Sequence, residues 1–461
     1  MFGLETSLAV LLIISIAAVC IFEFVNGFHD TANAVATVIY TGTLKPSYAV
    51  VWSGFCNFLG LMIGVGSGLK VAMGIVDLLP LADLASVNLY DGVFMVISIL
   101  IGAIIWNVGT WYFGIPCSSS HTLIGSILGA GIVFFLTHQG VSNVNWRKAS
   151  EIGMSLLISP MFGFACSIIL MFVGRQIFKK GERKFIFKEP VQGSVPPTWL
   201  RAILVTTCTG VSYFHGSNDG QKGVGLVLII LMAFFPLQYA LTPNYNDNNS
   251  MASIVAMEQA LIKDNKVDLV TELNKTKEAI VAHQLKPEKK EKFEVRKTLT
   301  KLTKRIKEEL TVNDATMSKG TKKVLKEESK KLKTYFILEP SDIYWVMIMI
   351  ALSIGIGTMI GWKRIVVTIG EKIGKRHMTY AEGATAEIVA AGTIGLSTGF
   401  GLPVSTTHVL SSGVAGAMTA SKGVKNLQAG TIKSIALAWL LTLPVTMILS
   451  GLFYWIFRLF L

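Results

Sequence analysis

Ionisable and amide side chains interrupt two apolar stretches of the chain, at residues 26–36 and 214–223. Both stretches are flanked by apolar sequence of the kind that crosses membranes. An ionisable side chain at the centre of a bilayer costs roughly 2.5–3.5 kcal/mol, so a functional role is the default interpretation. The side chains that we expect to bind or couple a cation or a proton are His29, Asp30, Asn33, Asn218, Asp219 and Lys222.

Hydroxyl side chains gather in two further segments, residues 114–123 and 401–410. Each begins with Gly-x-Pro and continues to three consecutive hydroxyl residues and a histidine. This order predicts a loop followed by the start of a helix. Hydroxyls and the free N–H groups of a helix start together form an anion site, whereas serines that only pack helices would bond to their own backbone. The predicted anion-binding side chains are Ser118, Ser119, Ser120, Ser405, Thr406 and Thr407.

The two polar stretches and the two hydroxyl segments form matching pairs along the chain. In the hydroxyl segments the Gly, the Pro, the first Ser, the His and the last Leu are identical. Such agreement predicts an internal duplication. The second copy is longer than the first by about the length of the polar stretch 242–340, which we therefore interpret as an insertion.

The charge pattern predicts how the two copies are oriented. The residues before the first apolar run carry no Lys or Arg, whereas residues 179–198 are basic and form a predicted cytoplasmic linker. The first copy then crosses the membrane an odd number of times, and the second must be inverted. Inverted repeats are typical of secondary transporters, with the binding site near the midplane between the repeats.

The composition places the chain among membrane proteins. It is 51% hydrophobic and 15% charged, against about 25% charged in a soluble domain. Apolar runs near the 18–20 residues of a spanning helix recur along the chain. We predict an all-α polytopic membrane protein with two inverted-topology repeats. It should have about 10–12 membrane segments, including re-entrant hairpin-like segments and broken helices. The first helix is expected to break at Asn26–Gly27.

The predicted domains follow from these boundaries. They are a first repeat (1–178), a basic linker (179–198), the start of a second repeat (199–241), a charged insert (242–340) and the remainder of the second repeat (341–461).

The insert carries about half of the Lys and Arg of the chain, whose net charge is +13. Its bias favours a cytoplasmic location. Lysines that alternate with glutamates, with few aromatic residues, do not favour nucleic-acid binding. A stripe of Leu299, Leu302, Ile306 and Leu310 predicts a surface helix, and another part of the insert is expected to be mobile. The five cysteines lack CxxC spacing, which predicts neither disulfides nor a metal site.

The paired polar stretches and the paired GxPxSxxH segments resemble the inorganic phosphate transporter (Pit) family, in its bacterial low-affinity branch. The resemblance covers both halves of the chain. It implies uptake of phosphate across the bacterial inner membrane, often as a neutral complex with Mg or Zn, driven by protons. Sodium-coupled relatives carry Gly-Ala-Asn-Asp-Val-Ala-Asn-Ala in both halves. Here His29 replaces the first asparagine of the first copy, and Lys222 replaces the last asparagine of the second copy. These differences argue against inferring the relatives' sodium site for this chain.

On this interpretation the hydroxyls of both halves bind phosphate, and the carboxylates of Asp30 and Asp219 must be neutralised. A buried carboxylate favours its neutral form, and a nearby cation reverses that preference. Lys222 follows Asp219 by about one helical turn and could pair with it. An ammonium in the place of a transported cation favours proton coupling over sodium coupling.

Four polar side chains remain around these groups. His29 is either a proton relay or a hydrogen-bonded structural group. His121 and His408 are expected to support the hydroxyl loops without binding metal. Glu23, one turn before the predicted break, either takes part in coupling or holds the first helix against a neighbour.

We therefore predict a secondary active phosphate symporter that works by alternating access, with no enzyme activity and no cofactor. The alternatives are a sodium-coupled symporter, a permease for sulfate or arsenate, a passive channel and a membrane enzyme that handles phosphoryl groups through His29 or His215. The predicted partners are inorganic phosphate, the proton, a divalent metal ion carried with phosphate and the lipid bilayer. Assembly into a homo-oligomer is left open.

Overall fold

In the computed structural model all regular elements of the described part of the chain are helices, apart from one isolated bridge between Gly374 and Leu427. The structure describes residues 6–79, 89–138, 144–190, 195–235, 241–242, 244–264, 267–312, 317–336 and 340–460.

The chain forms two compact units. The membrane unit takes its residues from Met1–Leu79, Phe94–Val227 and Tyr344–Leu461, and the insert unit from Pro80–Val93 and Leu228–Ile343. Two helices, α5 and α9, pass from one unit into the other. The membrane unit and the two shared helices contain α1 (Thr6–Tyr40), α2 (Pro46–Gly64), α3 (Lys70–Val76), α5 (Leu89–Tyr112), α6 (Ser119–Thr137), α7 (Trp146–Ile177), α8 (Lys180–Ile186), α9 (Thr198–Phe234), α15 (Tyr344–Met359), α16 (Lys363–Val367), α17 (Tyr380–Phe400), α18 (Thr406–Lys422) and α19 (Ala429–Arg458).

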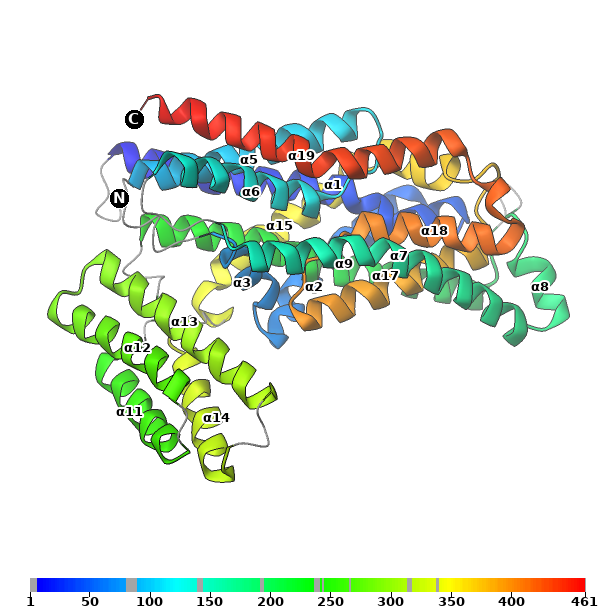
Figure 1. Ribbon diagram of the computed structural model, residues 1–461. Coiled ribbons are helices and arrows are strands. Elements are labelled where there is room, and N and C mark those ends of the chain that lie inside the picture. The colour runs from blue at the N-terminus through cyan, green and yellow to red at the C-terminus, as the bar shows by residue number, and fades with distance from the viewer. Residues whose placement is uncertain are drawn as a thin grey trace. The chain divides into compact units, whose positions relative to one another are not determined.

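The two halves of the chain repeat one order of helices with similar lengths. The 35-residue α1 corresponds to the 37-residue α9. Likewise α6 and α18 have 19 and 17 residues, and α7 and α19 have 32 and 30. The halves also exchange partners, because α6 packs along α19 while α18 packs along α7 (Figure 1). This order agrees with a duplication; the inverted topology stays a prediction.

Glycines permit the close approach of these exchanged helices. A Cβ on Gly129 of α6 would lie 2.0 Å from the Met447 carbonyl oxygen of α19. A Cβ on Gly416 of α18 would lie 2.4 Å from the Phe164 carbonyl oxygen of α7. Small residues at such contacts let helix backbones pack closely in a membrane. The pairing between halves therefore depends on positions where a larger side chain does not fit.

The predicted break of the first helix at Asn26–Gly27 is wrong, because α1 continues from Thr6 to Tyr40. The polar side chains find partners without unwinding the backbone: Asn26 Nδ2 donates to Glu23 at 3.2 Å. Gly27 serves a helix contact instead, since a Cβ there would lie 2.3 Å from the Ile354 carbonyl oxygen. The second polar stretch, residues 214–223, likewise lies within the continuous α9.

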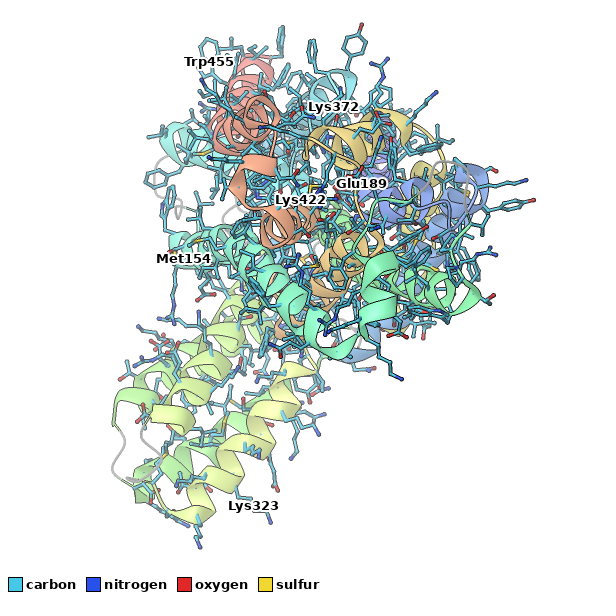
Figure 2. The ribbon with its side chains drawn as sticks, turned by 90° about the vertical axis from the view of Figure 1, so that its right-hand side faces the viewer. Met154, Glu189, Lys323, Lys372, Lys422 and Trp455 are labelled. Atoms are coloured by element: carbon cyan, nitrogen blue, oxygen red, sulfur yellow. The ribbon has the colours of Figure 1, made fainter. Side chains whose placement is uncertain are left out.

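Among the described residues, six helices are long and apolar enough to cross a membrane, and the bent pair α15 with residues 363–372 would make seven. The expected ten to twelve segments therefore stay a prediction. Apolar side chains face outward as lipid contact requires: Met154 on α7 and Trp455 on α19 lie at the outer surface (Figure 2) and are 53% and 51% exposed.

The described residues of the insert unit include a bundle of four helices with its own hydrophobic core. The leucine stripe faces this core, with Leu299, Leu302 and Ile306 fully buried. The expected helix is present, with this apolar face packed in the bundle and its charged face, including Lys301 and Arg305, exposed. Charged side chains such as Lys323 point to the solvent (Figure 2). The helices are α11 (Asp247–Lys263), α12 (Val267–Leu285), α13 (Lys289–Val312) and α14 (Lys319–Lys333).

Candidate functional site

Four helices of the membrane unit meet where the predicted site residues lie. The middle of α1 contributes Asp30 and the middle of α9 contributes Asp219, which are 2% and 0% exposed. The first turns of α6 and α18 contribute hydroxyls, as the sequence predicts for a loop followed by a helix start. Both halves of the chain thus supply one carboxylate and one hydroxyl-bearing helix start.

Two of the six predicted hydroxyls cap these helices. Ser118 Oγ accepts the backbone N–H of His121 at 3.1 Å, and Ser405 Oγ accepts that of His408 at 3.1 Å. Such N-caps stabilise a helix start by about 1 kcal/mol. Ser118 and Ser405 therefore shape the loops, while the next two hydroxyls of each loop face the carboxylates or their partners.

Neutral donors from both halves surround the Asp30 carboxylate. Ser119 and Thr406 each donate a hydroxyl proton to Oδ2 at 3.2 Å. Thr407 donates to Oδ1, and Asn33 Nδ2 donates to the same atom at 2.9 Å. Hydroxyls predicted to bind an anion thus already bind one, the carboxylate of Asp30.

A cation accompanies the second carboxylate. Lys222 Nζ lies 2.7 Å from Asp219 Oδ1, and the lysine is only 2% exposed. The ammonium also donates to Ser120 Oγ and, at 3.2 Å, to the carbonyl oxygen of Val404. Ser119 Oγ lies 3.3 Å from Asp219 Oδ2 and so bridges the two carboxylates. The predicted Asp219–Lys222 pair is present and tied to both hydroxyl loops.

His215 stands between the two carboxylates. Its Nε2 lies 3.5 Å from Asp30 Oδ2 and 3.7 Å from Asp219 Oδ2. Its Nδ1 lies 2.9 Å from Asn57 Oδ1. Asn57 Nδ2 donates to Thr358 at 2.8 Å, so the amide presents its oxygen to the histidine and Nδ1 must carry a proton.

This tautomer determines what Nε2 can do. A neutral His215 would turn a lone pair toward two carboxylates, which is repulsive. A proton on Nε2 or on a facing carboxyl oxygen converts the same geometry into a hydrogen bond. With Lys222 offsetting only one of the two negative charges, the cluster has the electrostatic balance to hold one further proton or cation.

The same three side chains could hold a metal ion, which the sequence did not indicate. One ligand atom from each of Asp30, His215 and Asp219 lies within 4.8 Å of the others. Carboxylates and an imidazole suit several divalent ions.

Other predicted residues lie beside this cluster and support it. Asn218 Nδ2 donates to Thr398 at 2.9 Å and its Oδ1 accepts the Val404 N–H at 3.3 Å, which holds the loop before α18. His29 Nε2 bonds Thr110 Oγ1 at 3.3 Å, so the structure directs it toward α5. Glu23 lies against the backbone of Gly223, as a helix-packing role would require.

His121 and His408, in the first turns of α6 and α18, pack against each other and support the hydroxyl loops. Their rings lie 4.5 Å apart, and His408 packs on Trp439 at 3.9 Å. His121 Nδ1 also bonds Ser118 Oγ at 2.8 Å. These contacts join the two loop helices across the boundary between the halves.

His215 is a site residue that was not predicted from the sequence, where it appeared only as a group of the alternative enzyme. One signal was available: His215 precedes Asp219 by four positions, which places both on one face of a helix. Asn57 and the Val404 carbonyl carried no such signal, because they reach the site from α2 and from the loop before α18.

Comparisons with known proteins find phosphate transporters. A model described as the phosphate transporter family matches residues 26–450. The chain is 38% identical to the low-affinity inorganic phosphate transporters PitB and PitA of Escherichia coli (strain K12), over 98% of each chain compared. A probable low-affinity inorganic phosphate transporter of Bacillus subtilis (strain 168) is 28% identical, with 97% of this chain and 98% of that one covered. A solved structure titled the sodium-dependent phosphate transporter has a TM-score of 0.56 at 20% identity, covering 98% of this chain and 100% of that one.

Proposed function

The chain belongs to the phosphate transporter family, and we propose that it carries inorganic phosphate into a bacterial cell by proton-coupled symport. It is a multi-pass membrane protein. The relatives named above are transporters, which sets aside the alternative of a phosphoryl-handling enzyme. The single observation that carries the proposal is the position of His215 between two carboxylates of which only one has a resident ammonium.

Competition for hydroxyl protons would couple phosphate to protons. Ser119, Thr406 and Thr407 each have one hydroxyl proton. The two threonines donate theirs to Asp30, and Ser119 shares its proton between Asp30 and Asp219. Phosphate needs the same donors. Protonation of Asp30 removes its charge and releases those protons, because a neutral carboxyl is a weaker acceptor. Phosphate then binds only when a proton has been taken up.

His215 would deliver that proton. It touches both carboxylates, and histidine changes its charge nearest to physiological pH. Lys222 would keep the Asp219 charge compensated while Asp30 titrates. A resident ammonium also occupies a position that a sodium ion would need, which is why we favour protons.

Two finer features belong to the same proposal. The halves would be inverted repeats whose hydroxyl loops, at the tips of the α5–α6 and α17–α18 hairpins, close the site alternately from each side. Divalent metal would travel as cargo with phosphate, since a neutral metal-phosphate adds no charge to a buried site. Release would follow when Asp30 loses its proton on the cytoplasmic side.

The length of α9 bears on the location of the insert. A helix of 37 residues is about 55 Å long, enough to cross a bilayer once, although the polar middle of α9 leaves it outside the apolar helices counted above. The linker before α9 and the insert after it would then lie on opposite faces. We propose a cytoplasmic linker and an external insert, in place of the cytoplasmic insert that the charge pattern predicts, since long loops are translocated largely regardless of charge. An impermeant amine reagent added outside intact cells should modify Lys323; protection in intact cells with modification after lysis would reverse the assignment.

Reconstituted vesicles test the coupling. Uptake of labelled phosphate should exceed equilibrium under an imposed pH gradient, acidic outside, without sodium. A sodium gradient at equal pH should give no accumulation; robust accumulation there would support the sodium-coupled alternative. Failure to accumulate under any gradient would indicate a channel. Competition by sulfate and arsenate, and parallel uptake with and without Mg or Zn, would define the substrate.

A further inference from the structure

Two cationic side chains bond to equivalent carbonyl groups at the tips of the two hairpins. Arg364 Nη1 donates to the Tyr112 carbonyl at 2.7 Å, near the end of α5. Lys70 Nζ donates to the Gly399 carbonyl at 3.0 Å, near the end of α17. Each carbonyl lies two residues before the turn glycine of its hydroxyl segment.

The two tips have the same backbone conformation. The turn glycines, Gly114 and Gly401, have φ of +66° and +73°, which glycine adopts without strain. In each tip the N–H of the glycine returns to the carbonyl three residues earlier, at 2.9 Å in the first and 3.0 Å in the second. The tips are therefore comparable features, and a cation at the same carbonyl of both is a repeated arrangement.

The cations come from crossed positions in the chain. Lys70 begins α3 in the first half and holds the hairpin of the second half. Arg364 lies in α16 of the second half and holds the hairpin of the first half. A cation near the last carbonyls of a helix also interacts favourably with its dipole. Each half thus fastens the loop that the other half contributes to the site.

We propose that Arg364 and Lys70 are matched latch residues, each of which keeps one hairpin tip closed over the buried site. The proposal rests on the transport function above. Opening of the α5–α6 tip requires release of Arg364, and opening of the α17–α18 tip requires release of Lys70. The hydroxyl loops directly follow the tips, so release exposes Ser119 on one side or Thr406 on the other.

The latches differ in strength. The Arg364 guanidinium lies over the rings of Trp111 and Tyr112, at 5.2 and 5.0 Å. Thr368 adds a hydrogen bond to the Gly114 carbonyl at 2.7 Å. Such cation–π contacts add to the hydrogen bond even at an exposed arginine, although less than at a desolvated one. Lys70 has one bond to its tip, and Asn218 holds the loop just beyond it. The Lys70 latch should therefore be the weaker of the two and release more readily.

Two equivalent loop positions report on opening. Cys117 and Val404 occupy the same place in their segments, and both are 0% exposed. A protein with Val404→Cys carries a buried thiol under each tip, and the alkylation rate of each is measured by mass spectrometry of its peptide. Cys208, also 0% exposed, reports on general loosening.

Each substitution is expected to expose only the thiol under the tip that its side chain holds. In this background Arg364→Ala should raise the alkylation rate of Cys117 about 10- to 100-fold, the range for loss of a charged hydrogen bond, and leave the thiols at 404 and 208 unchanged. Lys70→Ala should accelerate position 404 alone. Arg364→Lys keeps the charge without the ring contacts and should give an intermediate rate at Cys117.

Unchanged rates in both alanine variants would overturn the proposal. So would joint acceleration of positions 117 and 404 by either variant, or acceleration of Cys208, because these outcomes indicate general destabilisation. The labelling needs no phosphate transport. A negative labelling result would therefore overturn the latch proposal and not the symport proposal. A negative uptake result would overturn the symport proposal, and the labelling rates would still test the latches.

Discussion

The two carboxylates of the site are related by duplication but are held differently. Asp30 is surrounded by neutral donors from three helices, including its neighbour Asn33. Asp219 has the Lys222 ammonium at 2.7 Å, in the position equivalent to Asn33. One carboxylate therefore has a permanent counter-charge and the other does not. We therefore propose that Asp30 is the carboxylate that gains and loses the coupled proton.

Neutralising each carboxylate in turn should have the largest effect and tests whether the two have different roles. Asp30→Asn should lower phosphate accumulation at least about 100-fold, because an amide cannot take up and release a proton. Asp219→Asn should have as large an effect for another reason: a buried ammonium without its partner costs about 3–5 kcal/mol. Uptake in reconstituted vesicles measures both, with the exposed Glu151→Gln as a control. Near-normal accumulation in either variant would remove that residue from the mechanism.

The next largest effect should come from making the second half resemble the first. Lys222→Asn removes the resident cation and restores the asparagine of the sodium-coupled pattern. We expect uptake driven by a pH gradient to fall about tenfold or more, while a sodium gradient begins to stimulate uptake. Lys148→Asn, at a surface ion pair, is the matched control. An unchanged dependence on pH and sodium would show that Lys222 does not determine the coupling ion.

Shared hydroxyls should give a smaller and distinct effect. Thr406→Val and Ser119→Ala each remove one donor to Asp30 that phosphate would also use. The apparent KM for phosphate should rise about 10-fold, as expected for one hydrogen bond to a charged group. Ser126→Ala, on the same helix as Ser119 and away from the carboxylates, should change the KM less than about twofold. A decrease in maximal rate at constant KM would contradict a role in phosphate binding.

The smallest effect on coupling should come from helix packing beside the site. Gly27→Ala places a methyl group 2.3 Å from the Ile354 carbonyl oxygen. Overpacking of this kind costs about 1–3 kcal/mol, so the thermal midpoint of the purified protein should fall while the ratio of phosphate to coupled ion stays constant. Gly109→Ala, with open space around it, should be neutral. A change in coupling ratio would mean that the α1–α15 contact moves during transport.

Much of this arrangement could be predicted from local sequence. The hydroxyl segments predict a loop and a helix start, and the structure begins α6 and α18 within them. The spacing of Asp219 and Lys222 predicts their pairing, which the structure contains. These predictions succeed because they depend on neighbours within one turn of a helix.

Predictions that depended on other helices were less successful. A polar stretch with glycine suggested a broken helix, but Gly27 accommodates the backbone of α15 and α1 stays continuous. The role of His215 depends on Asn57, which is distant in sequence and orients the ring. The insert's leucine stripe indicated a helix correctly, while its burial needed the other helices of the bundle. The sequence pattern of one helix does not tell which other helix packs against it.

Proton uptake on phosphate binding tests the central claim most directly. Calorimetric titration of the purified protein with phosphate, in two buffers of different ionisation enthalpy, counts the protons bound with the anion. The wild type should take up about one proton more per phosphate than Asp30→Asn, in which the amide stands for the neutral carboxyl. Equal proton uptake in the two proteins, or wild-type binding that requires sodium, would contradict the assignment of the coupled proton to Asp30.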